Sequence, residues 1–260
     1  MMNGNGYHLF ESVLMRAKLP RPTVSSICIP TRRKPQRISM VNMRIRFTAA
    51  PGLDLLNKGQ VFVDMVQHNA VMQVFSKILG KQFILGSFAA NRLLPGAPGQ
   101  EPHVDYPYWD MHDVDEFPAG MNAGFHMNCQ SLISLHEFTA QNGATGIVPK
   151  SQKRGVYPTK EGFDAEFTQL SCPPGSLLLF TGLTWHCSMP NNSDGERTSV
   201  LGQYLPKFVK PMEDLQRGVA PHVLKAASPE LHQLLGTQLR YPEFLEEAEA
   251  GNAEGVSAAS

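Results

Sequence analysis

The feature that most constrains the fold is a succession of short apolar segments between residues 82 and 205, separated by turns rich in Gly, Pro and Asn. Segments of this length, bounded by turn residues, are typical of β-strands. Few stretches with a helical period lie between them, which favours antiparallel pairing over strand–helix–strand crossovers. The expected strands are 82–94, 125–138, 147–149, 176–180, 185–189 and 198–205. We therefore predict a mainly β fold, a cupin-like jelly roll with α-helices packed outside.

The longest of these segments, 125–138, alternates with a period of two. One face carries Phe125, Met127, Cys129, Ser131, Ile133 and Leu135, whereas His126, Asn128, Gln130, Ser134 and His136 lie mostly on the other. Such alternation is typical of a half-buried strand with one polar face. Helical periodicity is confined to 60–80, where Gly80 is placed to end the helix, and to 229–239.

Charge and composition divide the chain into three parts. Up to Arg46 there are nine basic residues and one acid, Glu11, and from Tyr241 onward there are five Glu and no Lys or Arg. We predict an irregular basic segment at 1–45, one domain at 46–240 and an acidic, disordered tail at 241–260. The basic segment has two interpretations, a solvated end or an organellar targeting peptide.

Other global features exclude some classes of protein. Lys+Arg and Asp+Glu both number 23, so the net charge of zero gives no general attraction to nucleic acid. No apolar run approaches the ~18 residues needed to span a membrane. The four cysteines form no CxxC pair, which favours a reducing compartment. We expect a cytoplasmic monomer or homodimer, with import into an organelle through the basic N-terminus as the alternative.

A His-x-Asp motif, His103-Val104-Asp105, is the first candidate for chemistry. Residues two apart on an extended segment point to the same side, so an imidazole and a carboxylate can bind one metal. His186 opens a later strand and is the natural third ligand. Two histidines and one carboxylate on one face of an octahedron are typical of non-haem Fe(II) oxygenases.

An arginine that follows the last of these histidines is a candidate for binding a carboxylate. Arg197 lies 11 residues after His186, across a turn at 191–195. We expect a hairpin that sets Arg197 on the strand beside His186, where its guanidinium could hold a carboxylate through two hydrogen bonds. Ser188, two residues beyond His186, would face the same way. A 2-oxo dicarboxylic acid could then reach the metal with its other end.

These candidate residues lie within a longer stretch of the chain that resembles a known protein family. The chain resembles the phytanoyl-CoA dioxygenase family of Fe(II)- and 2-oxoglutarate-dependent oxygenases over about residues 45–206. The matching stretches are 55–59, 85–91, 100–106 with Tyr108-Trp109, 138–145, 148–151, 174–176, and Trp185-His186 followed by Arg197. They occur in the order and spacing of the family, and together they are specific.

The resemblance implies a double-stranded β-helix with His103, Asp105 and His186 as iron ligands and Arg197 as the anchor for 2-oxoglutarate. It adds Gln100 and Thr139 as further contacts of 2-oxoglutarate, and Ser188 matches a hydroxyl of some members. The implied reaction uses O₂ and 2-oxoglutarate, releases succinate, and most commonly hydroxylates an unactivated C–H of a small molecule.

The substrate is open at this point. Tyr106, Tyr108 and Trp109 follow the first two ligands and are candidates for lining its pocket, with ordinary core packing as the alternative for each. The zero net charge and these aromatic residues favour a neutral or apolar small molecule as the substrate. Two other functions compete: a non-catalytic relative that binds a small molecule or metal, and a zinc hydrolase that uses the same three ligands.

Overall fold

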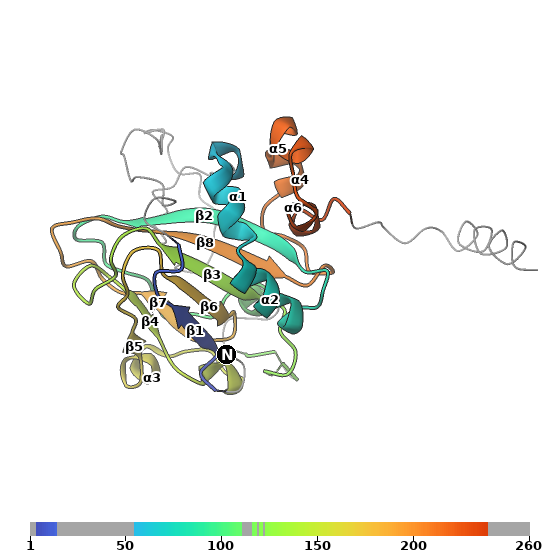
Figure 1. Ribbon diagram of the computed structural model, residues 1–260. Coiled ribbons are helices and arrows are strands. Elements are labelled where there is room, and N and C mark those ends of the chain that lie inside the picture. Colours follow the sequence, from blue (N-terminus) through green and yellow to red (C-terminus); the bar gives the residue numbers. More distant parts are fainter. Residues whose placement is uncertain (1–3, 15–54, 111–115, 119, 122, 239–260) are drawn as a thin grey trace, which may run out of the picture.

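The computed structural model describes residues 4–14, 55–110, 116–118, 120, 121 and 123–238 (Figure 1). The strands are β1 (Tyr7–Phe10), β2 (Ile84–Leu93), β3 (Cys129–Ser134), β4 (Thr145–Ile147), β5 (Thr168–Gln169), β6 (Leu177–Thr181), β7 (His186–Ser188) and β8 (Arg197–Leu205). The helices are α1 (Gln60–Val66), α2 (Asn69–Ile78), α3 (Lys160–Asp164), α4 (Leu215–Gly218), α5 (Pro221–Lys225) and α6 (Pro229–Leu234). Short 3₁₀ turns form at Leu55–Lys58, Tyr108–Asp110 and Ser151–Lys153.

The strands form two antiparallel sheets. The large sheet has five strands in the order β1-β6-β3-β8-β2, and the small sheet has three in the order β5-β4-β7. Every strand pair is antiparallel, with β3 at the centre of the large sheet between β6 and β8. The prediction of a mainly antiparallel β fold is therefore confirmed. The strand predicted at 125–138 is shorter than expected, because regular pairing covers only Cys129–Ser134.

The outer face of the large sheet is covered by helices and supplies the main core. In Figure 1, α1 and α2 lie across the strands β2, β8 and β3, and α4 to α6 gather beside them. Phe75 of α2 is completely buried, with its ring centroid 5.0 Å from that of Tyr204 on β8. This core also takes Leu85, Cys129, Ile133, Leu179 and Val200 from the sheet and Leu231 and Leu234 from α6.

Two predictions of local structure need correction. The helix predicted over 60–80 is divided at Gln67-His68, because the His68 side chain accepts the Ala70 N–H and begins a second helix. The predicted stop at Gly80 is confirmed, since α2 ends at Ile78 and Gly80 has a φ of +92°. The segment 1–45, predicted to be irregular, contains β1, which forms the edge of the large sheet and pairs with β6. The remainder of that segment from residue 15, and the tail 241–260, lie outside the described residues.

The expected hairpin between His186 and Arg197 is wrong. His186 begins β7 of the small sheet, whereas Arg197 begins β8 of the large sheet. The chain crosses from one sheet to the other at the 191–195 turn, where Asn191 donates to the carbonyls of Leu93 and Gly195. The two sheets face each other, as shown by the packing of Ile147 of β4 in one cluster with Leu132 and Leu178 of the large sheet. Arg197 therefore faces the histidine strand across the interior.

Candidate metal centre and its surroundings

The segment that carries His103 and Asp105 runs antiparallel to β7 and is fixed to it by backbone hydrogen bonds. Gln100 N–H donates to the Ser188 carbonyl at 2.8 Å, and His103 and His186 exchange both N–H···O bonds at 3.0 and 3.1 Å. The two histidines thus stand directly opposite each other. Gly99 precedes this segment with a φ of +82°, and a Cβ there would lie 2.6 Å from the Ser188 carbonyl oxygen. The close approach of the two segments therefore requires glycine.

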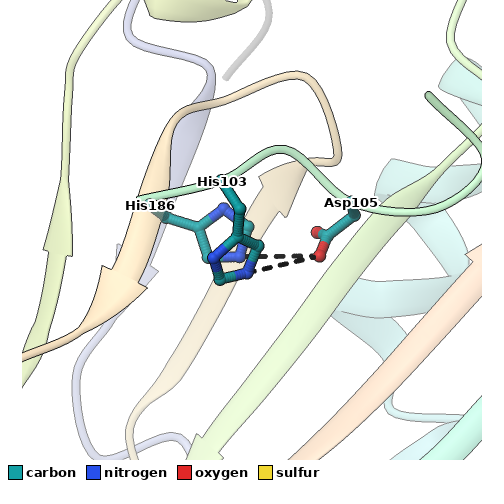
Figure 2. A group of neighbouring side chains, drawn as sticks. All are labelled: His103, Asp105 and His186. Atoms are coloured by element: carbon teal, nitrogen blue, oxygen red, sulfur yellow. Dashed lines mark ion pairs between the residues drawn. The ribbon is translucent and has the colours of Figure 1, made fainter. Parts of the chain in front are cut away.

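Three side chains from these segments converge on one point (Figure 2). The Nε2 atoms of His103 and His186 lie 3.9 and 3.6 Å from Oδ1 of Asp105. One potential ligand atom from each residue lies within 4.8 Å of the others, so one metal ion could contact all three. In the described part of the chain, this is the group of His, Cys and acidic residues that meets that criterion.

Hydrogen bonds orient both imidazoles for this contact. Nδ1 of His103 lies 2.8 Å from the Glu101 carbonyl oxygen, and Nδ1 of His186 lies 2.9 Å from the Thr184 carbonyl oxygen. A carbonyl can only accept, so each Nδ1 carries the proton and each Nε2 presents a lone pair. Fixing the second ring nitrogen in this way is the usual arrangement for histidines that bind metals. Phe180 of β6 packs edge-on against the His186 ring, at 4.6 Å between centroids.

The charges of the group are not balanced by the protein alone. Burial raises the pKa of Asp105 to about 6, against smaller opposing effects of His103 and a hydrogen bond from Gln130. Burial lowers the pKa of His103 and of His186 to about 4. Oδ2 of Asp105 has no hydrogen-bond partner among the described residues. Two neutral imidazoles and a carboxylate with a free oxygen fit a divalent cation, which would supply the missing positive charge.

A buried arginine occupies the interior opposite β7. Arg197 is completely buried, with its guanidinium 4.3 Å above the Phe138 ring. It donates from Nη1 to Ser199 Oγ at 3.3 Å and from Nη2 to the Gly143 carbonyl, and its Nε has no partner. No carboxylate of the described residues pairs with it, and burial lowers its pKa to about 10. A buried guanidinium without a counterion fits an anionic ligand, because an uncompensated buried charge is costly.

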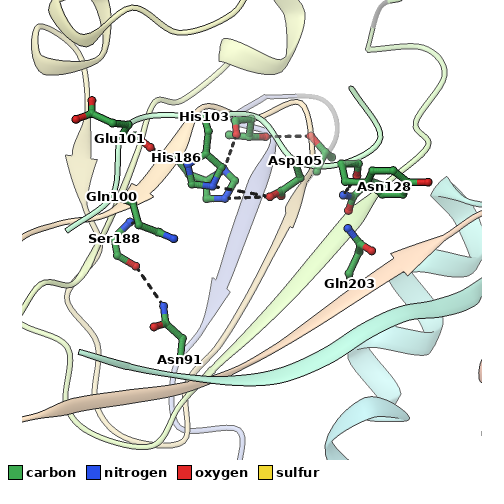
Figure 3. A network of polar contacts seen from close by, with 12 residues as sticks. Asn91, Gln100, Glu101, His103, Asp105, Asn128, His186, Ser188 and Gln203 are labelled. Carbon is green, nitrogen blue, oxygen red and sulfur yellow. Dashed lines mark hydrogen bonds and ion pairs between the residues drawn. The ribbon is translucent and has the colours of Figure 1, made fainter. Parts of the chain in front are cut away.

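Gln100, Ser188 and Thr139, the other predicted contacts of 2-oxoglutarate, lie on or next to the segments that carry His186, His103 and Phe138. Gln100 Oε1 accepts the Ser188 N–H at 3.0 Å, and Ser188 Oγ lies 3.5 Å from Asn91 Nδ2 of β2 (Figure 3). Thr139 follows Phe138, on which Arg197 stacks, and its hydroxyl accepts the Asn142 N–H at 3.2 Å. Its role in this turn leaves the Thr139 hydroxyl proton free to donate.

The aromatic residues proposed for the substrate pocket separate into two groups. Tyr108 is completely buried in a second core cluster, and its hydroxyl accepts the Met127 N–H at 2.7 Å. Burial raises the pKa of that phenol further above its usual range. Tyr106 and Trp109 are partly exposed and pack edge-on against each other at 5.8 Å. Tyr108 therefore packs as a core residue, whereas Tyr106 and Trp109 lie nearer the surface, where the Tyr106 hydroxyl donates to the Lys210 carbonyl at 3.0 Å.

Sequence reasoning missed several polar residues around the site. Asn91 contacts Ser188, Gln130 hydrogen-bonds Asp105, and Asn128 and Gln203 lie nearby. The alternation of 125–138 placed Asn128 and Gln130 on one polar face. That alternation could have found them, because a polar face turned toward a second sheet must surround a ligand or a network.

Two facing antiparallel sheets with a largely buried two-histidine, one-carboxylate group define a β protein with a site suited to a divalent metal. Comparison with known proteins gives the family: the phytanoyl-CoA dioxygenase (PhyH) family matches residues 28–199. The chain belongs to this family, and the resemblance found in its motifs is confirmed.

Individual relatives are distant. Dioxygenase lolE1 of Epichloe uncinata is 27% identical over 174 residues, which cover 64% of this chain and 62% of the relative. Dioxygenase trt7 of Aspergillus terreus is 24% identical over 70% of this chain and 63% of its own length. Dioxygenase cdmA of Talaromyces verruculosus is 33% identical over 55% of this chain and 46% of its own length. The chain thus matches less than two thirds of each of these relatives. No helix among the described residues has the length and apolar character to cross a membrane.

Proposed function

We propose that this chain is an Fe(II)- and 2-oxoglutarate-dependent dioxygenase that hydroxylates a C–H bond of a small organic molecule. The observation that carries the proposal is the pairing of two features in one interior: the convergent His103, Asp105 and His186, and the buried, counterion-free Arg197. Membership of the family and the dioxygenase names of its relatives support it. A zinc hydrolase would have no use for the second feature.

In this proposal, His103, Asp105 and His186 hold the iron through their free Nε2 and carboxylate atoms. Bound Fe(II) would supply the activation of O₂ that C–H oxidation requires. In the overall reaction, one oxygen atom of O₂ enters the substrate C–H bond as a hydroxyl. The other enters 2-oxoglutarate, which leaves as succinate and CO₂.

Arg197 would bind the distal carboxylate of 2-oxoglutarate, which would satisfy its free Nε and balance its charge. Its Nη1 donates to Ser199, which lies two residues along β8 on the same face of the strand. Gln100, Thr139 and Ser188 would complete the polar wall around the co-substrate. Ser188 is buried, whereas Gln100 and Thr139 are partly exposed. Hydrogen bonds are stronger where water is excluded, so the wall would hold the co-substrate best on its buried side.

The proposal extends to the architecture. The two facing sheets support a double-stranded β-helix, the jelly roll of cupin-like proteins, formed within a catalytic unit at 46–240 with helices flanking it. Tyr106 and Trp109 are proposed to border the substrate entrance, and Tyr108 to support them from the core.

An anaerobic titration tests the function directly. Fe(II) added to metal-free protein with 2-oxoglutarate should give a weak visible charge-transfer band, and admission of O₂ should then form succinate. Asp105→Ala should remove both signals. Tight zinc binding with no such band would favour a hydrolase, and metal binding without succinate in the presence of a substrate library would favour a non-catalytic relative.

A further inference from the structure

Three carboxamide side chains lie side by side on the inner face of the large sheet. Gln130 of β3 and Gln203 of β8 are direct partners in the antiparallel register. Asn128 precedes Gln130 by two residues and lies on the same side of the chain. Figure 3 shows Asn128 and Gln203 together beyond Asp105, on the side opposite Ser188 and Asn91.

The cross-strand row that contains two of these residues also supports the candidate ligands. Phe180 of β6 pairs with Gln130, which pairs in turn with Gln203. Phe180 packs against the His186 ring, and Gln130 hydrogen-bonds the Asp105 carboxylate. Gln203, the next residue of this row, therefore lies just past the metal ligands.

The carboxamides of Asn128 and Gln203 are buried without adequate partners. Asn128 is 0% exposed and Gln203 is 3% exposed. Asn128 Oδ1 and Gln203 Oε1 have no hydrogen-bond partner among the described residues. The Gln203 Nε2 has a thioether partner, Met212 Sδ at 3.6 Å, which is a weak acceptor.

The orientation of Asn128 is determined by its neighbour. Its Nδ2 donates to the Tyr106 carbonyl, so the free atom must be the oxygen, since two acceptors cannot bond. Gly182 packs against this amide, and a Cβ there would lie 2.8 Å from Asn128 Cγ. The site thus presents one fixed free acceptor beside an amide that can donate or accept.

The position of Arg197 decides which ligand these groups would meet. Arg197, Ser199, Leu201 and Gln203 alternate along the same face of β8. Arg197 and Gln203 are six residues apart, or about 20 Å on an extended strand. If 2-oxoglutarate extends from Arg197 to the metal, Asn128 and Gln203 lie beyond the metal, where only the substrate remains.

We infer that Asn128 and Gln203 recognise a hydroxyl group on the substrate, which therefore belongs to the class of neutral alcohols rather than pure hydrocarbons. A hydroxyl donates one hydrogen bond and accepts others, so it can donate to Asn128 Oδ1 and accept from Gln203 Nε2 at once. The inference rests on the proposed function, and it sharpens the expectation of a neutral or apolar substrate.

Matched small probes test this inference. 4-tert-Butylcyclohexanol, 4-tert-butylcyclohexanone and tert-butylcyclohexane share a skeleton and differ in donor and acceptor groups. Binding is measured by ligand-observed NMR on the full chain with Zn(II) and 2-oxoglutarate, which gives no turnover. The alcohol should bind about tenfold more tightly than the hydrocarbon, as expected for a hydrogen bond to a buried unpaired group, with the ketone between them.

Substitutions of Gln203 test whether this residue causes the preference for the alcohol over the hydrocarbon. Gln203→Met keeps the length and removes both polar atoms, so the preference for the alcohol should fall several-fold; Gln203→Leu is the second variant if that one does not fold. Gln233→Met is the matched control, because it removes a partly buried glutamine that bonds the Phe83 carbonyl on another part of the molecule.

The Fe(II)–2-oxoglutarate charge-transfer band distinguishes a failure of the proposed function from a failure of the inference about the substrate hydroxyl. An absent band contradicts the proposed function. With the band present, equal binding of alcohol and hydrocarbon, including no binding of either, overturns the inference about the substrate. A preference that survives both Gln203 substitutions overturns it as well.

Discussion

The two faces of the large sheet are built from the same strands but have different tasks. The outer face presents Leu85, Ile133, Val200 and Tyr204 to the helices, and the Tyr204 hydroxyl donates to the Val66 carbonyl at 2.9 Å. The inner face presents Gln130, Ser199, Gln203 and Arg197, of which Gln203 and Arg197 have polar atoms without a partner among the described residues. Apolar burial stabilises the fold, whereas unpaired buried polar groups oppose it. The outer face therefore stabilises the sheet, and this stability offsets the cost of the unpaired polar atoms that the inner face keeps for a ligand.

The largest expected effect is at the metal centre that the inner face surrounds. Asp105→Ala should lower succinate formation by at least about a thousandfold, because it removes the only anionic ligand of the group. Unfolding by urea should show a stability equal to or greater than that of the unaltered chain without metal, since a buried carboxylate with a free oxygen is removed. A variant that retains metal and turnover would contradict the assignment of this ligand.

The outer face should show the opposite behaviour. Phe75→Ala should reduce the free energy of unfolding by about 3–5 kcal/mol, because it leaves a cavity beneath a completely buried ring. The folded fraction should keep its affinity for metal and 2-oxoglutarate. Urea titration followed by anaerobic binding on the same sample measures both quantities, and a loss of affinity without a loss of stability would break the proposed division between the faces.

Arg197 gives the next effect in size. Arg197→Met should raise the 2-oxoglutarate concentration needed for half-maximal turnover about a hundredfold, equivalent to about 2.7 kcal/mol, because the distal carboxylate loses a buried charged partner. Stability should change little, since a buried charge without a counterion is removed.

The matched control for this prediction lies on the neighbouring strand. Arg92 of β2 is partly exposed and forms an ion pair with Glu196. Arg92→Met should leave the 2-oxoglutarate requirement within about twofold, as is usual for exposed ion pairs. Equal effects of the two substitutions would show that general electrostatics, and not a specific contact, controls co-substrate binding.

These contrasts also explain how far the sequence alone could lead. The period-two pattern and the turn residues predicted most strands, and the His103, Asp105 and His186 motif could be recognised because its spacing is local or matches a family. The pattern could not tell that β7 and β8 belong to different sheets, because an 11-residue step is compatible with a hairpin or a crossing. Likewise, Gln130 and Gln203 are 73 residues apart and meet only through strand register, which no local pattern encodes.

In metal-free protein, the free energy of unfolding should depend moderately on pH, because the three candidate metal ligands change protonation state on folding. Between pH 4 and 6 the two histidines are protonated when unfolded and neutral when folded, whereas Asp105 is ionised when unfolded and protonated when folded. The unfolded chain then binds one more proton, so these groups should raise stability by about 1.4 kcal/mol per pH unit.

Asp105→Asn sharpens this test because it removes the one opposing group. The contribution of the site should roughly double, to about 2.7 kcal/mol per pH unit, since two protons are then released on folding. Urea unfolding of chelator-treated protein at pH 4.5 to 6 measures the slope, with Asp64→Asn on the exposed side of α1 as the control. An unchanged slope in Asp105→Asn would mean that the Asp105 pKa is not raised by burial.

The smallest expected effect is at Ser188, on the small sheet opposite Asn91. Its hydroxyl is held by one long contact of 3.5 Å, so Ser188→Ala removes little from the empty protein. If the hydroxyl also donates to the 2-oxoglutarate carboxylate beside Arg197, affinity should fall about threefold to tenfold, the usual value of a single hydrogen bond.

Combining Ser188→Ala with Arg197→Met then separates a shared ligand from two independent sites. If both residues bind one carboxylate, the double variant should lose less affinity than the two single losses predict, because the serine contact has little effect once the anion is no longer held. Strict additivity would contradict a carboxylate shared by Ser188 and Arg197, because it would show that the two residues contribute independently to 2-oxoglutarate affinity.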